Sequence, residues 1–557
     1  MFVRPKKSGR YTYLQVVQNQ RIDGRVRQQT IATLGRLDVL QTQGQLDGLV
    51  RSCARFTQNV SVLDAYQRQE LPAVTTVKIG PPRVFERLWQ ELGLPGILEE
   101  LLVGRRYEFA VERAIFVTVL HRLMVSGSDR AAEQWVRDYA LAGAEGLQLQ
   151  HLYRAMAWLG EELPADQQAG STGFVRRCTK DRIEELLFAR RRTLFGDLDL
   201  VFFDTTSVYF EGQGGRTIGR HGHSKDHRPD LPQMVVGAVL DGTGRPLCCE
   251  LWPGNTTDVK TLVPIVDRLR QRFHITRICL VADRGMISKQ TLAELGQPTR
   301  GVHFILGARM RLVKEVRAVV LADAGPYEEV YGPKADSKDP APLEVKEVKV
   351  GPRRYVVCRN ADQAKKDRED RQAIVAHLRE QLKQGDKSLV GNQGYRKYLQ
   401  TTGTGRRFEI DENKIQEEEK YDGLWVLQTD LDLPAKEVAL RYKELWQVEQ
   451  IFRTVKSILE NRPIYHKVDA TIRGHVFCSF LALVLLKELQ TRMAQRGWTY
   501  EWDRLRADLD SLQEVTVHAQ GQPFVIRTQT RGAAGQALQA AGVALGPVVR
   551  PLPKESS

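Results

Sequence analysis

Two aspartates in this chain each follow a short run of apolar residues. Asp204 follows the run 200–203 (LVFF), and Asp283 follows the run 279–282 (CLVA). Such runs are typical of buried strands, and in α/β sheets the carboxyl ends of strands border the crevice where ligands bind. Gly285, just after the second aspartate, would allow a bulky ligand to approach the backbone closely. Each aspartate alone is also compatible with a turn or a helix cap, but the pair favours a functional site.

A third carboxylate lies on an expected helix further along the chain. Tyr442, Glu449 and Lys456 are spaced by seven residues, nearly two helical turns, so they are expected on one face. Arg453, four residues after Glu449, joins them. The same spacing also fits an ordinary glutamate–arginine pair on a helix surface, worth roughly a few tenths of a kcal/mol. The neighbouring stripe is expected to pack on a sheet and consists of Leu445, Trp446, Val448, Phe452 and Val455.

Two aspartates and one glutamate form an acidic set of oxygen ligands. Hard divalent cations, Mg²⁺ or Mn²⁺, prefer such ligands together with water and phosphate oxygens. Two such ions roughly 3.5–4 Å apart activate a nucleophile and stabilise the leaving oxygen of an in-line phosphoryl transfer. Lys456 and Arg453 are placed to hold the flanking phosphates. The residues therefore predict metal-assisted chemistry on a phosphate ester.

The segment that must position the two aspartates has the pattern of an α/β layer. A mixed sheet is expected, because strands and helices alternate there. Asp258 is a good N-cap residue for the first of two helices. Asp197 and Asp199 precede the first strand and are not counted in the site. The expected strands are 198–204, 207–210, 232–241, 245–254, 275–283 and 302–308, with helices at 258–273 and 288–296.

The remaining segments are expected to surround this core. Two β-prone runs, 11–20 and 26–35, flank an Asp-Gly turn and predict a hairpin, followed by helix to about Arg55. Residues 80–195 are mostly helical with basic outer faces, which fits a DNA-binding module or plain helical packing. We divide the chain into a basic hairpin and helix (1–60), a helical region (61–195), the first part of the core (196–309), a β-rich insertion (310–432), the second part of the core (433–495) and a C-terminal tail (496–557). The insertion is expected to surround a charged helix at 362–383. The second part of the core is expected to hold helices at 434–459 and 469–492, and the tail a hairpin arm at 522–530.

The charge of the chain indicates a polyanionic partner. The net charge is +14 and the pI about 9.4. Residues 1–60 hold ten Lys/Arg and three Asp/Glu, a surplus of +7. Nucleic acid, an acidic membrane face or simply a solubilising surface would each explain this surplus. The most apolar run, 476–486, is too short to span a bilayer and predicts a buried helix, so no membrane is expected.

Cysteine spacing and the chain start bear on the compartment. Seven cysteines occur without a C-x-x-C pair, which argues against a zinc ribbon and fits a reducing cytosol. Residues 1–13 are basic and lack the apolar stretch of a signal peptide. P-loop and G-x-S-x-G motifs do not occur where they would matter, which argues against a P-loop NTPase and an α/β-hydrolase.

The chain resembles the DDE transposases of bacterial insertion sequences, which have an RNase H-like core. It is most similar to the group with a Y-x2-R-x3-E-x6-K signature, matched here by Tyr442, Glu449 and Lys456. Leu445 replaces the signature arginine, and Arg441, Lys443 or Arg453 is available in its place. The stretches FFDTTSVYF (202–210), VADRGM (281–286), HSKDHRPDLPQMVVG (223–237) and PGNTTD (253–258), and the insertion before Glu449, also resemble this group.

The resemblance implies roles for these residues. Asp204, Asp283 and Glu449 would be the catalytic, metal-binding triad for Mg²⁺ or Mn²⁺. Tyr442 and Lys456 would contact DNA near the cleaved end, and Arg453, Lys225 and Arg284 are further expected DNA contacts. The implied reaction is hydrolytic nicking at the element's ends, followed by attack of the freed 3′-hydroxyl on target DNA. A homodimeric synaptic complex in the bacterial cytosol, at the nucleoid, is implied as well.

Other interpretations remain open beside this one. The chain would also fit an RNase H-like nuclease without strand transfer, or a non-catalytic DNA-binding regulator derived from a transposase. The loop with His221, His223 and His227 would bind a transition metal or, with Lys225 and Arg228, contact DNA. His466 is expected to be a packing or helix-start residue. Three tryptophans would stack on an unpaired base or pack in the core, namely Trp252, Trp425 and Trp446.

Overall fold

A computed structural model gives the structure of the chain in two compact units. One unit comprises Met1–Val84, Arg137–Ala140 and Tyr500–Ser557, and the other Phe85–Val136 and Leu141–Thr499. The structure describes residues 1–22, 25–42, 44–54, 73–125, 127–169, 171, 175–191, 199–275, 278–286, 288–297, 301–334, 336, 339–384, 396–402, 407–457, 463–519 and 522–551. The turn at 23–24, the helix end at Arg55 and Asp197 lie outside these ranges.

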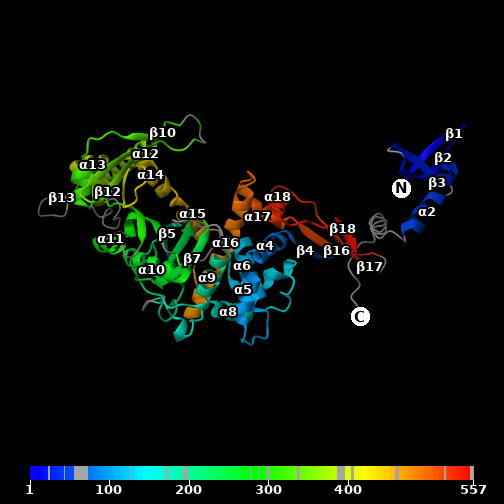
Figure 1. Ribbon diagram of the computed structural model, residues 1–557, viewed down its shortest axis with the longest axis horizontal. Helices are drawn as coiled ribbons and strands as arrows, with labels where there is room; N and C mark the ends of the chain where they lie inside the picture. Colours follow the sequence, from blue (N-terminus) through cyan, green and yellow to red (C-terminus); the bar gives the residue numbers. More distant parts are fainter. Residues whose placement is uncertain are drawn as a thin grey trace. The chain divides into compact units, whose positions relative to one another are not determined.

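The first unit contains two antiparallel sheets. β2 (Tyr11–Ile22) and β3 (Arg25–Arg36) form the predicted hairpin, and β1 (Phe2–Ser8), which was not predicted, pairs with β2. Two helices follow, α1 (Leu37–Thr42) and α2 (Gln45–Ala54). The other sheet has the order β18-β17-β16-β4, so the predicted hairpin arm is real. Its strands are β4 (Ala73–Lys78), β16 (Gln513–Ala519), β17 (Gln522–Arg527) and β18 (Val549–Pro551), and α17 (Trp502–Asp510) and α18 (Ala534–Ala540) flank them in sequence (Figure 1).

The region before the core is helical, as predicted. α6 is buried along nearly its whole length and packs against α8 and α16. The helices are α4 (Gly80–Glu91), α5 (Leu94–Leu102), α6 (Val111–Met124), α7 (Asp129–Trp135), α8 (Leu149–Leu159) and α9 (Thr179–Arg191).

A nine-stranded mixed sheet forms the core of the second unit. Its order is β10-β11-β12-β15-β9-β8-β5-β6-β7. β5 (Asp199–Tyr209) pairs antiparallel with β6 (Gln233–Asp241), which pairs antiparallel with β7 (Pro246–Pro253). On its other side β5 runs parallel to β8 (Ile278–Ala282), which runs parallel to β9 (Val302–Gly307). Three antiparallel strands followed by two parallel ones confirm the predicted mixed sheet and RNase H-like core.

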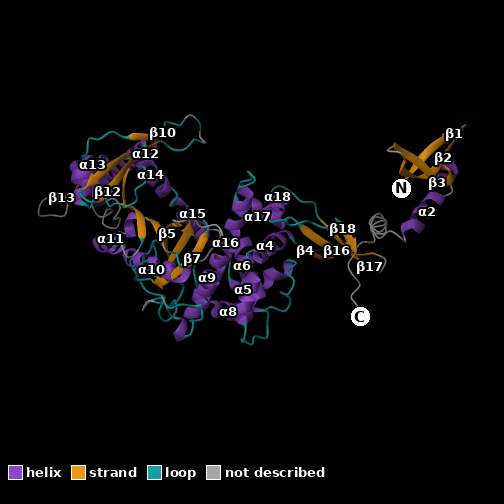
Figure 2. Ribbon diagram, in the orientation of Figure 1, coloured by secondary structure: helices purple, strands orange, loops and turns teal. Residues whose placement is uncertain are grey.

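Helices cover both faces of this sheet (Figure 2). α9 and α10 (Leu262–Phe273) supply side chains to one apolar cluster with the odd-numbered residues Val201 and Phe203 of β5. α16 (Asp469–Ala494) packs on the opposite face, where Val208 and Phe210 point. α14 (Ala435–Lys443) contacts β8 and β9, and α15 (Trp446–Ser457) contacts β5 and β6. Because side chains alternate along a strand, Asp204 belongs to the face of Val208.

The predicted insertion before Glu449 extends the core sheet. β15 (Leu424–Thr429) pairs with β9, and the sheet continues outward through β12 (Arg353–Arg359), β11 (Leu343–Val350) and β10 (Glu328–Tyr331). The predicted charged helix is α12 (Ala361–Gln384). The remaining elements are a π-helical turn at Val316–Val320, β13 (Leu399–Thr402), β14 (Arg407–Ile410) and α13 (Glu412–Glu419).

Two element boundaries were predicted wrongly. The two expected strands at 198–204 and 207–210 are one strand, β5, because antiparallel pairing with β6 continues past Asp204 as far as Tyr209. The expected single helix 434–459 is two helices, since the backbone tightens to three-residue hydrogen bonds at the junction, where Leu445 N–H donates to the Tyr442 carbonyl.

The helix with the most apolar run is longer than that run. α16 has 26 residues and passes a test of length and hydropathy for a membrane span, but 72% of its apolar window is buried inside the protein. It packs against α6, α8 and β7. The predicted buried helix is therefore present, while the argument from the length of the apolar run does not apply to the whole helix.

Candidate active site

The sheet register places Asp204 beside Asp283. Parallel pairing between β5 and β8 ends with Phe202 opposite Val281. Asp204 lies two residues after Phe202, and Asp283 lies two residues after Val281. Because side chains alternate along a strand, each aspartate points to the same face of the sheet as the residue two positions before it, and the register sets the two aspartates side by side. Ile278, Leu280 and Ala282 of β8 belong to the cluster under α10, which leaves Asp283 on the opposite face. Both aspartates therefore lie on the face that α14 and α15 cover.

Asp204 is poorly solvated and surrounded by negative charge. Burial raises the pKa of its carboxyl to about 6, and Asp283 and Asp258 add to the rise by repulsion. Two contacts oppose this rise in pKa. They are the positive charge of Lys225 and a hydrogen bond that the Thr205 N–H donates to Asp204 Oδ1 at 2.7 Å. A carboxylate in this setting gains from a cation that neutralises the group.

Lys225 is held against this cluster. Its Nζ lies 3.1 Å from Asp258 Oδ2 and donates to the Thr205 carbonyl at 2.7 Å. Thr205 Oγ1 in turn donates to Asp258 Oδ1 at 2.7 Å. The prediction that Asp258 caps the following helix is wrong. A short 3-10 turn, Asp258–Lys260, precedes α10, and Thr261 occupies the N-cap position. Its carboxylate is free to bind Lys225 and Thr205 instead.

Tyr442 fixes the second aspartate. Its hydroxyl donates to Asp283 Oδ1 at 3.3 Å. Burial and the negative charge of Asp283 raise the pKa of the Tyr442 phenol, so it stays protonated and keeps donating. The close approach depends on Gly307 at the end of β9, because a Cβ there would lie 2.6 Å from the Tyr442 hydroxyl oxygen.

Glu449 comes from the first turn of α15, after the break that separates this helix from α14. α15 packs on β5 and β6 through its buried residues Val448 and Ile451. The helix break means that Tyr442 and Glu449 do not stack on one regular helix, yet both line the same cavity. Glu449 lines the cavity together with Asp283 and Tyr442, and its negative charge acts on the Tyr442 phenol. Among the described residues, no contact joins Glu449 directly to Asp204.

The other predicted residues of this helix have mixed outcomes. Arg453 is exposed, and the Lys456 side chain lies outside the described residues. Leu445, Val448 and Phe452 are buried as predicted. Trp446 was expected in the buried stripe but is 56% exposed, since the helix begins at this residue and turns it away from the sheet.

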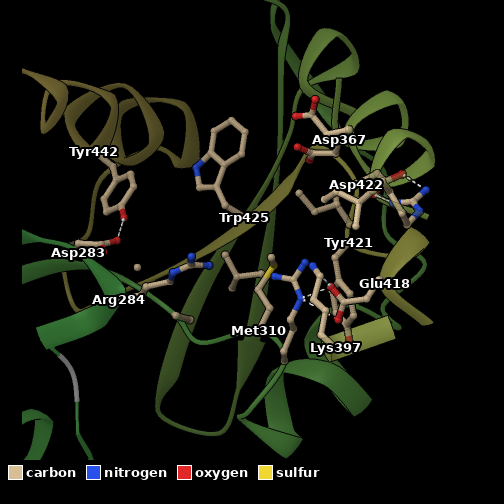
Figure 3. A pocket seen from close by; sticks show the side chains of 18 of the residues that line it. Asp283, Arg284, Met310, Asp367, Lys397, Glu418, Tyr421, Asp422, Trp425 and Tyr442 are labelled. Atoms are coloured by element: carbon tan, nitrogen blue, oxygen red, sulfur yellow. Dashed lines mark hydrogen bonds and ion pairs between the residues drawn. The ribbon is translucent and has the colours of Figure 1, made fainter. Parts of the chain in front are cut away.

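A cavity of about 570 Å³ opens from the carboxylates toward the inserted segment (Figure 3). Asp283, Arg284, Tyr442 and Glu449 line one side of it. Trp425 of β15 is half-buried and lies across from Asp283 and Arg284. The remaining wall carries paired charges and aromatic rings, including Arg311 with Glu418, Arg371 with Asp422, Lys397, Tyr398 and Tyr421.

Other predicted candidates are not part of this site. Trp252 is buried and packs edge-on against Phe203, as expected for a core residue. His221, His223 and His227 do not form a three-ligand group, although all three are described residues. Arg228, which was predicted with Lys225 to contact DNA, pairs with Asp230 at 2.8 Å.

Sequence reasoning missed the roles of two residues and left that of a third open. Asp258 was assigned a capping role, and its place five residues after the end of β7 gave no signal of its contacts with Lys225 and Thr205. Gly307 gave no signal, because the need for a glycine arises from the nonlocal approach of Tyr442. Trp425 was considered mainly as a core residue, and only the cavity distinguishes it from one.

The chain matches two known families. Residues 3–67 match the IS1634 family transposase, N-terminal domain, and residues 196–485, just over half of the chain, match the transposase DDE domain. A search of the curated proteins found no match.

Solved structures give only distant similarities. A piggyBac transposase synaptic complex with hairpin DNA is 10% identical, with 77% of this chain and 79% of that chain covered and a TM-score of 0.37. A Mos1 mariner paired end complex with Mn is 11% identical, with 36% and 59% covered and a TM-score of 0.13. The family assignment therefore depends on the two sequence families, and it agrees with the mixed sheet and its paired aspartates. The chain belongs to the DDE transposases, enzymes that bind, cut and join DNA with divalent metal ions.

Proposed function

We propose that this transposase cleaves the ends of its insertion sequence and joins them to target DNA at a site formed by Asp204, Asp283 and Glu449. The proposal is carried by one observation, the register that continues from Phe202 opposite Val281 to the two aspartates. Both then lie on the face that α14 and α15 cover, and α15 bears the glutamate.

The donor set fits a hard divalent cation. All three groups are carboxylates, and the pKa of Asp204 is raised to about 6 by burial and by its acidic neighbours, a cost that a bound cation would relieve. Asp204, Asp283 and Glu449 would hold Mg²⁺ or Mn²⁺. When bound, such ions activate the attacking oxygen and neutralise charge on the leaving oxygen.

The chain's own residues orient this site. Tyr442 donates to Asp283 and fixes the direction of its second oxygen. Lys225, tied to Asp258 and Thr205, supplies a positive charge that favours ionised Asp204. Because Lys225 is occupied in this way, we assign it an orienting role in place of a primary phosphate contact.

The cavity suits a DNA strand end. Arg284 lies beside Asp283 on its wall and would contact a backbone phosphate. Trp425 faces the same space and would stack on an unpaired base, an interaction worth about 1–3 kcal/mol. Arg453 and Lys456 remain proposed phosphate contacts.

The rest of the chain would recognise the element's ends. The surplus of basic residues in 1–60 falls on the three-stranded sheet β1–β3 and its helices. Such a surface suits the terminal repeats. Pairing of two ends would require a homodimer, acting at the nucleoid in the bacterial cytosol and away from membranes. The six-segment domain division given above is part of this proposal.

A strand-transfer assay tests the proposed reaction. A pre-cut end oligonucleotide with a free 3′-hydroxyl is incubated with a supercoiled plasmid, the protein and Mg²⁺ or Mn²⁺. We expect joined products that disappear with a chelator and when the 3′-hydroxyl is replaced by hydrogen. Metal-dependent nicking without joining would favour a nuclease. Binding without either reaction would favour a regulator.

A further inference from the structure

A second group of metal-ligand side chains lies in the larger unit, away from the carboxylate site. Asp129 is the first residue of α7, His475 lies in α16, and His466 lies in the segment that precedes α16. One ligand atom from each residue converges on the same point. All three side chains are largely buried, with exposed fractions of 7%, 13% and 14% for Asp129, His466 and His475.

The spacing of the three ligand atoms matches a metal site. His466 Nε2 lies 3.2 Å from Asp129 Oδ2 and 3.1 Å from His475 Nδ1, and His475 Nδ1 lies 3.7 Å from Asp129 Oδ2. A tetrahedral zinc ion with bonds of about 2.0–2.1 Å separates its ligands by about 3.3 Å. The three atoms therefore stand at the corners of a triangle of the required size.

When His466 donates to Asp129, no hydrogen bond holds its Nε2 at 3.1 Å from His475 Nδ1. The one hydrogen on His466 Nε2 can point directly at Asp129 or at His475, and not at both. His475 Nδ1 already accepts a hydrogen bond from Arg122 at 2.9 Å.

We propose that Asp129, His466 and His475 bind one divalent transition-metal ion of the Zn²⁺ class. Two imidazole nitrogens and one carboxylate suit such an ion better than the Mg²⁺ or Mn²⁺ expected at the all-carboxylate site. The ion fixes the start of α7 to α16 and to the segment before α16. Ile464 of that segment pairs with the end of β5, the strand that carries Asp204, through its N–H to the Tyr209 carbonyl at 3.2 Å.

Arg122 sets the strength of this site. Its guanidinium lies 3.3 Å from Asp129 Oδ1 and donates to Ser479 Oγ at 2.6 Å. When the ion takes His475 Nδ1, Arg122 keeps these two partners. Asp129 then binds the ion through Oδ2 and Arg122 through Oδ1, which orients the carboxylate. The positive charge of Arg122 also opposes the cation.

Zinc binding by the full-length protein tests the proposal. The protein carries Asp204→Asn and Asp283→Asn to weaken the carboxylate site, and Cys53→Ser to remove the exposed thiol. After treatment with a chelator, Zn²⁺ is titrated against a chromophoric competitor, and Co²⁺ is used as a spectroscopic probe. We expect one equivalent of Zn²⁺, a nitrogen- and oxygen-ligated Co²⁺ spectrum, and a higher unfolding temperature with Zn²⁺.

Histidine variants decide whether these residues are the ligands. His466→Gln should weaken Zn²⁺ binding at least about tenfold and remove the thermal shift, while His303→Gln, at a half-exposed histidine elsewhere on the sheet, should change neither. His466→Gln carries the test if His475→Gln fails to fold. Failure of the protein to bind Zn²⁺, or equal binding by His466→Gln and the parent protein, would overturn the proposal.

Discussion

Charged side chains gather in two places in the larger unit, and the two places differ in how their charges are matched. Where α9, β7 and α10 meet, three cations and three carboxylates are fully buried and paired with one another. This set consists of Lys180, Arg268, Arg272, Asp181, Glu184 and Glu250. In the candidate active site, the charged neighbours of Asp204 are one ammonium, Lys225, and two carboxylates, Asp258 and Asp283.

The two sets show how charge balance separates a structural cluster from a reactive one. In the buried network, burial opposes ionisation of Asp181, but Lys180 and Arg272 outweigh it and hold its pKa below the usual range, whereas burial raises the pKa of Glu184 in the same network. In the active site, burial and like charges together raise the pKa of Asp204. Removing one member of a matched buried set leaves an unpaired charge and costs stability, whereas unmatched carboxylates create a place for a cation.

The largest expected effect is on stability, in the matched network. Arg272→Met leaves Glu184 and Glu250 without the guanidinium that contacts them at 2.5 and 2.7 Å. Removing one partner of a buried ion pair costs about 3–5 kcal/mol of unfolding free energy. Urea denaturation measures this, with Arg182→Gln, at a half-exposed ion pair, as a control expected below about 1 kcal/mol. Equal losses of unfolding free energy for the two substitutions would show that the buried network contributes no more than a half-exposed ion pair.

The unmatched site should respond in the opposite direction. The folded-state pKa of Asp204 is raised, so ionisation destabilises the fold as pH rises from about 4 to about 6. Asp204→Asn should therefore stabilise the metal-free protein at pH 7, by up to about 3 kcal/mol. The gain should fade as pH falls toward about 4 and vanish below about pH 3, where Asp204 is protonated in both states. Thermal unfolding across this pH range measures the effect, and a loss of stability at pH 7 would contradict it.

The position of Asp283 should depend on the space beside Tyr442. A Cβ at Gly307 would lie 2.6 Å from the Tyr442 hydroxyl oxygen, so Gly307→Ala should displace the ring and its hydrogen bond to Asp283. We expect a loss of about 10²-fold in the rate of end cleavage, the scale of a misplacement near 1 Å. Tyr442→Phe alone loses the hydrogen bond without displacing the ring, so the double variant, which lacks the clashing hydroxyl, should recover only to the rate of Tyr442→Phe. No recovery would place the cause of the loss elsewhere.

The smallest expected effect concerns the charges around Asp204. Lys225→Met removes the neighbour that favours its ionised form, and Asp258→Asn removes one that opposes it. The pH below which Mn²⁺ binding fails should therefore rise with Lys225→Met and fall with Asp258→Asn, with severalfold changes in affinity near pH 6. Electron paramagnetic resonance of free Mn²⁺ measures this. Shifts in the same direction for both variants would argue against the assigned charges.

The core could be predicted from the sequence because its signals are local. Apolar runs such as 200–203 define the strands, and the helix 288–296 was recognised from Ser288 and Gly296, which do cap α11 (Lys289–Leu295). The two aspartates were likewise found from the runs they follow. These features depend on neighbours in the sequence, which hydrophobic patterning and capping rules describe well.

The features that were missed depend on distant partners. β5 continues past Asp204 because β6 pairs with it, and no residue near Asp204 signals this. Asp258 binds Lys225 and Thr205 only after the chain has folded. The exposure of Trp446 follows from a helix break that uninterrupted helical spacing does not predict. Register and nonlocal contacts are set by tertiary packing, so they could not be read from one sequence.

Cleavage of element-end DNA by Asp204→Asn, measured together with DNA binding, tests the proposed metal site most directly. The variant keeps the size of the side chain and the oxygen that accepts from the Thr205 N–H. We predict that it binds end DNA as the unmodified protein does, while Mg²⁺-dependent cleavage falls at least about 10³-fold. Cleavage at an undiminished rate by a folded, DNA-bound variant would contradict the assignment of Asp204 to the catalytic site.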